Sequence, residues 1–294
     1  MDTIIQILAR ELGRSEAHVE NVVRLIDEGN TIPFIARYRK ELHGAMDDTA
    51  LRTLADRLQY LRNLDKRREE VKSAIEGQGK LTEELSAAID AAATLAEVED
   101  LYRPYKQKRR TRATVAREKG LEPLAELLFA QAADGPAPEE AAGAFIDPEK
   151  GVATAEDALQ GASDIIAERI SDDADIRKRL RELVWKKGSL VSAAAAKEPE
   201  DTVYRLYYAF RSPLNRVQGH QVLAINRGER EGVLKVSVEM EREAALIPVR
   251  RAVLNPGAPA MAFVRAAAED AYDRLIFPSV EREMRGLLTE QADE

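Results

Sequence analysis

The feature that most constrains the fold is one uninterrupted helical pattern, residues 49–76. Its apolar side chains recur every three or four positions, and neither glycine nor proline breaks the run. That spacing places them on one face of an α-helix. At about 1.5 Å per residue such a helix reaches about 40 Å, so it must anchor an array of packed helices. The stripe consists of Leu51, Leu54, Leu58, Leu61 and Leu64.

Composition extends this prediction to the rest of the chain. Aromatic residues make up only 5%, charged residues 33% and hydrophobic residues 45%, and alanine, the best helix former, is abundant. We therefore predict a mainly α fold, an elongated multi-helix array. The absence of cysteine excludes disulfides and thiolate metal sites. No apolar window is long enough to span a bilayer, which predicts a cytoplasmic protein with no membrane partner.

The N-terminus has a helix-turn-helix-like pattern. Residues 3–12 form an apolar helical stripe, Gly13 interrupts it, and Ser15 is a good N-cap for a second helix. A helix that reads DNA offers Arg, Lys, Asn or Gln to the bases, whereas this second helix is mostly acidic outside. The pattern therefore favours a helix-packing unit over a DNA reader.

Two further helices are expected before residue 103. Pro33 suits the first turn of a short helix, in which Phe34, Ile35 and Tyr38 are expected to pack inward. A later helix is expected to begin at the cap Thr82 and to run as one piece to the basic segment that follows.

Near the other end the pattern changes. Residues 222–226 and 233–240 alternate apolar and polar positions, and the six residues between them include two glycines, so we predict one small β-hairpin near 222–240. The polar residues 198–201 read as a joint. They divide the chain into an N-terminal helical region, 1–196, and a central region, 197–294.

The basic segment, residues 103–112, holds six cations and no acid in a chain whose net charge is -8. With Tyr105 and the preceding Tyr102 it offers flat surfaces beside cations, a combination that binds single-stranded nucleic acid. The alternative is a solvated turn with both tyrosines in the core, which residues alone slightly favour. Three cations, Arg37, Arg39 and Lys40, join the candidate site if the fold brings them near. The other candidates are Tyr102, Arg103, Tyr105, Lys106, Lys108, Arg109, Arg110 and Arg112.

No catalytic constellation is evident. The histidines His18, His43 and His220 are far apart in sequence, and none has a partner at metal-ligand spacing. No zinc-helix, nucleophile-elbow or EF-hand motif occurs. We therefore expect a protein that is not an enzyme and that needs no cofactor or metal.

Five stretches, in order, resemble one family, the bacterial transcription accessory protein Tex. They are GNTIPFIARYRKE at 29–41, EDLYRPYK at 99–106, AREKGLEPL at 116–124, AINRGE at 224–229 and LIFPS at 275–279. The resemblance covers essentially the whole chain. It implies a largely helical core of a nucleic-acid-binding factor linked to transcription, followed in the family by resolvase-like, helix-hairpin-helix and OB-fold domains. None of these domains appears here, so we expect the natural chain to continue.

The combined prediction is the N-terminal region of a Tex-like protein. It is a helical scaffold whose basic surface makes weak, sequence-independent contact with nucleic acid, either RNA or single strands. The alternative is a purely structural scaffold that docks on RNA polymerase or other transcription proteins. An exposed Trp185 favours such a protein interface, whereas a buried one indicates simple packing.

Overall fold

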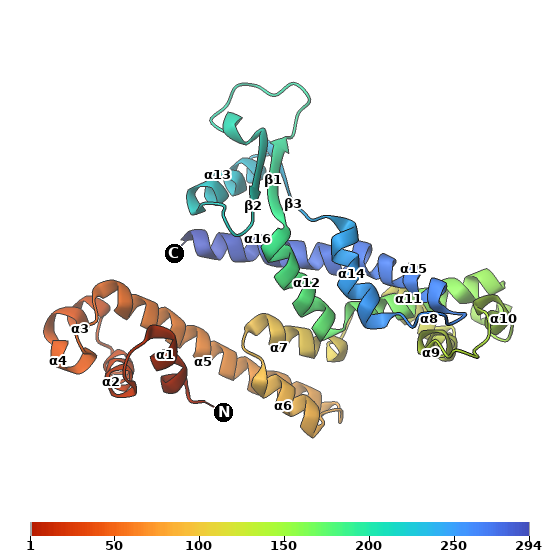
Figure 1. Ribbon diagram of the computed structural model, residues 1–294, viewed down its shortest axis with the longest axis horizontal. Helices are drawn as coiled ribbons and strands as arrows, with labels where there is room; N and C mark the ends of the chain where they lie inside the picture. Colours follow the sequence, from red (N-terminus) through yellow and green to blue (C-terminus); the bar gives the residue numbers. More distant parts are fainter. Residues whose placement is uncertain (1, 294) are drawn as a thin grey trace. The chain divides into compact units, whose positions relative to one another are not determined.

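The computed structural model describes residues 2–293. The chain forms two compact units, an N-terminal unit, Met1–Tyr105, and a C-terminal unit, Lys106–Glu294 (Figure 1). Each unit has its own cluster of buried apolar side chains. The described part is mainly α-helical, as the composition predicts, with one small sheet in the C-terminal unit. Among the described helices, none is long and apolar enough to cross a membrane.

The N-terminal unit is built on the long helix that the leucine stripe predicts. All five leucines of the stripe are buried. Gly13, at φ +62°, ends the first helix in the left-handed conformation, and Ser15 caps the second, as expected. The helices are α1 (Ile4–Leu12), α2 (Glu16–Asp27), α3 (Ile32–Tyr38), α4 (Lys40–His43), α5 (Asp48–Gly77), α6 (Glu83–Ala91) and α7 (Leu95–Tyr102).

The single helix expected from Thr82 to the basic segment is wrong, because the chain breaks between α6 and α7. Ala92 has an extended backbone (φ -61°, ψ 124°), and its carbonyl oxygen accepts a hydrogen bond from Arg68 Nη2 of α5 at 2.5 Å. Thr94 then caps α7 by accepting from the Glu97 amide at 3.2 Å. Tertiary contact and a new cap therefore override the helix propensity of the alanines.

Among its described residues, the C-terminal unit carries nine α-helices and a small sheet. Its central helix is α11, whose Ala158, Ala162, Ile165 and Ile166 are all buried. The helices are α8 (Arg112–Glu118), α9 (Glu122–Ala130), α10 (Pro138–Gly143), α11 (Ala155–Ser171), α12 (Ala174–Lys187), α13 (Gly219–Arg230), α14 (Arg242–Val253), α15 (Met261–Asp270) and α16 (Phe277–Asp293). A π-helical turn, Ala271–Ile276, joins α15 to α16.

The expected hairpin near 222–240 is wrong in its first half. Residues 222–226 lie on α13, and only the second half forms a strand, β3 (Leu234–Glu239). Its partner is β1 (Ser189–Ala194), the middle strand of an antiparallel sheet with the order β2-β1-β3, in which β2 is Ala209–Pro213. Val222 and Ile225 are both buried at helical spacing, so the apparent alternation was a short sample of a helical stripe.

Residues 198–201, which read as a joint, lie in the connection between β1 and β2. Those two strands pair with each other, Val191 opposite Arg211, so one compact unit continues across this point. The chain instead divides after Tyr105, inside the basic segment.

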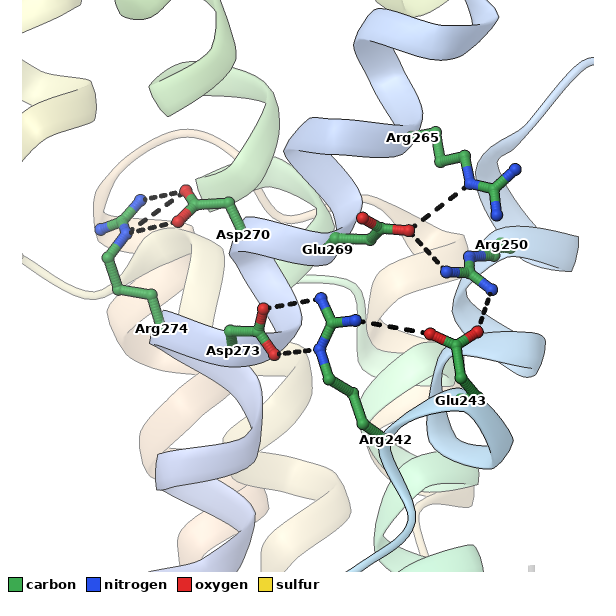
Figure 2. A network of polar contacts seen from close by, with 8 residues as sticks. All are labelled: Arg242, Glu243, Arg250, Arg265, Glu269, Asp270, Asp273 and Arg274. Atoms are coloured by element: carbon green, nitrogen blue, oxygen red, sulfur yellow. Dashed lines mark hydrogen bonds and ion pairs between the residues drawn. The ribbon is translucent and has the colours of Figure 1, made fainter.

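A network of ion pairs fastens α14 to the helix that follows it (Figure 2). Arg242, at the start of α14, donates to both carboxylate oxygens of Asp273 in the π turn, each at 2.9 Å. Arg250 bridges Glu243 of its own helix and Glu269 of α15. Because these pairs are partly exposed, they fix the geometry of the two helices more than they add stability.

Candidate functional site

The basic segment does not form a helix. It leaves α7 through a 3-10 turn, Arg103–Tyr105, and runs on to α8, whose N-cap is Thr111. Its residues therefore belong to both units. Tyr102, Arg103 and Tyr105 lie in the N-terminal unit, whereas the cations from Lys106 onward lie in the C-terminal unit.

The two tyrosines pack partly into the core of the N-terminal unit. The Arg67 guanidinium carbon lies 5.5 Å from the ring centre of Tyr102, and the carbonyl oxygen of Tyr105 accepts a hydrogen bond from Gln78 Nε2 at 2.8 Å. Arg103 is half-buried. The partial burial of both tyrosines agrees with the alternative prediction, a solvated turn in which these rings pack against the core.

Lys108 is held by carboxylates of the C-terminal unit. Its Nζ pairs with Asp172 and lies 3.6 Å from Glu168 Oε1. Glu168 also accepts hydrogen bonds from Thr111 Oγ1 and Arg117 Nη1, both at 2.9 Å. Burial alone would raise the pKa of Glu168, but these partners outweigh it and hold the pKa below its ordinary value. Glu168 thus fixes the start of α8 to α11.

This anchor predicts an acid-sensitive contact. Because the pKa of Glu168 is lowered in the folded chain, its contribution to stability is present above the ordinary carboxyl pKa and is lost as the pH falls through the lowered value. We expect Glu168→Gln to cost about 2 kcal/mol at neutral pH, as for a hydrogen bond to a charged group. Urea unfolding of both proteins checks this, and a cost that does not shrink in acid would contradict it.

Four other cations of the segment lie at the surface. Lys106, Arg109, Arg110 and Arg112 are exposed. Arg110 pairs with the exposed Glu118 at 2.9 Å, an arrangement worth little in water. Among the described residues, no carboxylate forms an ion pair with Arg109 or Arg112. Arg109 therefore keeps its charge available to an anion, whereas the charge of Arg112 also acts on the nearby carboxylate of Asp164.

A cleft of about 510 Å³ lies beside these arginines in the C-terminal unit. Arg110, Arg112 and Lys119 supply its cations, and Asp164 of α11 lies in its wall. Asp164 is 8% exposed, accepts a hydrogen bond from Gln160 at 3.1 Å, and has a pKa raised by burial. Asp164 is distant from the basic segment in sequence, so only the fold could add it to the candidate site; Lys119 follows the segment on the far side of α8.

The remaining candidates lie together near the end of α3, at the residue that links it to α4, and at the start of α4. Arg37, Arg39 and Lys40 are exposed as expected, but the expectation that Phe34 and Tyr38 pack inward is wrong. Phe34 is 38% exposed and Tyr38 59% exposed. A helix of seven residues turns one narrow face to its neighbours, and Ile35 alone is buried there. The structure thus creates an aromatic and cationic surface that the sequence did not predict.

No metal centre is evident in residues 2–293, which hold no group of three or more His, Asp or Glu side chains placed to share an ion. Trp185 is half-buried and packs against the core of the C-terminal unit, so it is neither the exposed side chain expected of a protein interface nor the buried one expected of simple packing.

Comparison with known proteins identifies the family. Residues 134–294 match the family model described as Tex central region-like, and residues 2–76 match that of the Tex-like protein N-terminal domain. The chain is 46% identical over 292 residues to the uncharacterized protein YdcI of Bacillus subtilis, covering 98% of this chain and 40% of that protein.

Two other relatives carry more informative names. Identity is 37% over 300 residues to the transcriptional accessory protein Tex of Neisseria gonorrhoeae, with 99% of this chain and 39% of that protein covered. It is 31% over 306 residues to the human S1 RNA-binding domain-containing protein 1, with 99% and 30% covered. The chain therefore spans well under half the length of these relatives. On the strength of both family matches, it belongs to the Tex family.

Proposed function

We propose that this region of a Tex-family protein is a non-catalytic helical scaffold whose C-terminal unit contacts the phosphates of nucleic acid without reading bases. The observation that carries the proposal is the exposure of Arg109 and Arg112 without ion pairs beside Arg110. Relatives named as a transcriptional accessory protein and as an S1 RNA-binding domain-containing protein support the ligand class.

The charge distribution of the chain makes this exposure informative. A chain with a net charge of -8 repels polyanions as a whole, so any contact must come from a local patch. Elsewhere in the C-terminal unit, arginines such as Arg242, Arg250 and Arg274 are paired with carboxylates. In the patch from Arg109 to Arg112, the exposed Glu118 and the buried Asp164 compete with a phosphate for Arg110 and Arg112, and Arg109 has no ion-pair partner among the described residues. Each phosphate contact formed releases a counterion.

A salt series tests the proposal. Labelled RNA and DNA, single-stranded and duplex, are titrated with the chain and with a variant carrying Arg109, Arg110 and Arg112 changed to Glu. Lys108 is left intact because an acid there would face Glu168 and Asp172. We expect the slope of log affinity against log salt to become shallower by about two to three, as loss of three phosphate contacts requires.

A matched control separates the patch from net charge. Arg216, Arg230 and Arg251 are also exposed in the C-terminal unit, and changing them to Glu alters the net charge equally. This control is expected to keep most of the wild-type slope. Equal losses in both variants, or no binding even at low salt, would refute the proposed site.

A second candidate function, docking of a protein of the transcription machinery, has its own observation. The connection between β1 and β2 presents Val203 at 86% exposure and Leu206 at 79%. Two large apolar side chains so close in sequence and so exposed are typical anchors of a protein contact.

A further inference from the structure

We propose that α3 and the two residues that follow it, Arg39 and Lys40, form a base-stacking surface for single-stranded nucleic acid. We call it the α3 surface, and it consists of Phe34, Arg37, Tyr38, Arg39 and Lys40. The proposal deepens the proposed function, on which it rests for the class of ligand. It adds a second nucleic-acid contact, in the N-terminal unit, and it predicts that the chain prefers single strands, whose bases are unpaired.

The aromatic pair is the first observation. Among the large apolar side chains that the structure describes as exposed, the aromatic ones are Phe34 and Tyr38, and they are neighbours. Their ring centres lie 5.1 Å apart at 44°, one helical turn from each other. The Arg37 guanidinium carbon lies 5.9 Å from the Tyr38 ring centre. Bases stack on such exposed rings whatever their sequence.

The cations around the rings are the second observation. Long-range pairs neutralise other arginines of the N-terminal unit, with Arg57 to Glu11 at 2.7 Å and Arg62 to Asp27 at 2.7 Å. No carboxylate in the described part of the chain forms an ion pair with the three cations of the α3 surface. Their charges are therefore free to meet the phosphates on either side of a stacked base.

The backbone beneath the surface is fixed, which lowers the entropic cost of binding. Ile35 is wholly buried, and Asn21 Nδ2 donates to the carbonyl oxygen of Leu42 at 3.2 Å. His43 Nδ1 accepts from the Met46 amide at 2.9 Å. At Gly44, with φ +61°, an added Cβ would lie 2.4 Å from His18 Nδ1, so the turn after α4 packs closely on α2. The rings and cations are thus carried by a backbone that is already ordered before a ligand binds.

A protein partner fits this surface less well. Two rings supply little apolar area compared with the roughly 800 Å² that each partner of a stable protein complex buries. Three cations beside them would also need matching acids. A single strand supplies both parts, flat bases and one phosphate per nucleotide.

The test compares a strand without bases with two strands that carry them, one of DNA and one of RNA. Labelled oligothymidine, oligouridine and an abasic DNA backbone, each about 20 nucleotides long to exceed a typical single-stranded site, are titrated with the full chain. We expect wild type to bind oligothymidine and oligouridine alike, and to bind the abasic strand about tenfold more weakly.

The variants separate stacking from charge. Phe34→Leu with Tyr38→Leu removes the rings, and we expect it to lower affinity for oligothymidine about tenfold without changing the salt slope. Tyr38→Phe keeps the ring and is expected to bind as wild type. Changing Arg37, Arg39 and Lys40 to Gln is expected to reduce the salt slope by about two. Because these side chains are exposed, circular dichroism should show unchanged helix content in each variant.

A photocross-link gives a readout that needs no variant. Oligonucleotides carrying 5-iodouracil are expected to cross-link to Phe34 or Tyr38, as located by mass spectrometry. Any one of three results would overturn the proposal and indicate that the α3 surface binds another kind of partner. The double leucine variant would bind with unchanged affinity, wild type would bind the abasic strand as tightly as the others, or the cross-links would form only at other residues.

The two proposals can fail separately. If the variant of Arg109, Arg110 and Arg112 binds as wild type while the leucine variant is weakened, the phosphate site is refuted and the α3 surface stands. The opposite result refutes the α3 surface alone. No binding of any probe at low salt refutes both.

Discussion

Gln131→Ala is expected to destabilise the C-terminal unit by about 3 kcal/mol, because it strips partners from several buried polar groups at once. Gln131 is 3% exposed. Its Nε2 donates to the carbonyl oxygen of Val253 at 2.7 Å, and its Oε1 accepts from the Asn255 amide at 2.9 Å. The side chain thus ties the end of α9 to the end of α14.

Gln131→Gly is the matched variant. Gln131 has φ +48°, a left-handed conformation that alanine resists and glycine adopts freely. We therefore expect the glycine variant to lose the same hydrogen bonds but to be about 1 kcal/mol more stable than the alanine variant. Urea unfolding followed by the fluorescence of Trp185, the only tryptophan of the chain, reports this unit alone. Two variants of equal stability would contradict the conformational argument.

Gly228→Ala and Gly286→Ala are expected to change stability in opposite directions. Both glycines lie inside helices, where alanine is preferred by about 1 kcal/mol. At Gly286 a new Cβ would meet nothing within 4 Å, so we expect that gain in full. At Gly228 it would lie 2.5 Å from Leu234 Cδ1 and 3.1 Å from Tyr204 Cδ1, and the overpacking should cost about 2 kcal/mol.

The same tryptophan fluorescence measures both substitutions, since both sites lie in the C-terminal unit. The net expectation is a loss of about 1 kcal/mol at Gly228 against a gain of about 1 kcal/mol at Gly286. A gain at both positions would show that Leu234 swings away without cost, and that α13 does not need its glycine to approach β3.

The long helix and the caps were predictable because they depend on local chemistry. A leucine every three or four positions defines one buried face wherever the partner helices lie, and Ser15 and Thr82 cap helices through their own side chains. The family could likewise be predicted, because several long stretches of matching residues in the same order identify a family without knowledge of its fold.

The errors arose where tertiary contact decides between two local options. Residues 222–226 suit a strand or a helix equally well over so short a stretch, and packing on β3 and α16 selects the helix. The break at Ala92 depends on Arg68, which is distant in sequence. The exposure of Phe34 and Tyr38 could not be read from their hydrophobicity, because it depends on how much of a short helix its neighbours cover.

The candidate site was predictable as a list of cations but not as a surface. Sequence alone could not separate Lys108, which pairs with Glu168 and Asp172, from Arg109, which does not. Those two acids lie on the last turn of α11 and at the residue that follows it, far along the chain. Which charges of a basic run remain available is a property of the folded neighbours.

The π turn between α15 and α16 bears on how this protein can vary in length. An α-helix rotates by about 100° per residue, so one residue added or lost within it turns every later side chain to a new face. A π turn holds one residue more than an α turn. Residues 271–276 are therefore a place where a deletion could be absorbed by a return to α geometry, keeping Val280, Met284 and Leu288 in the core.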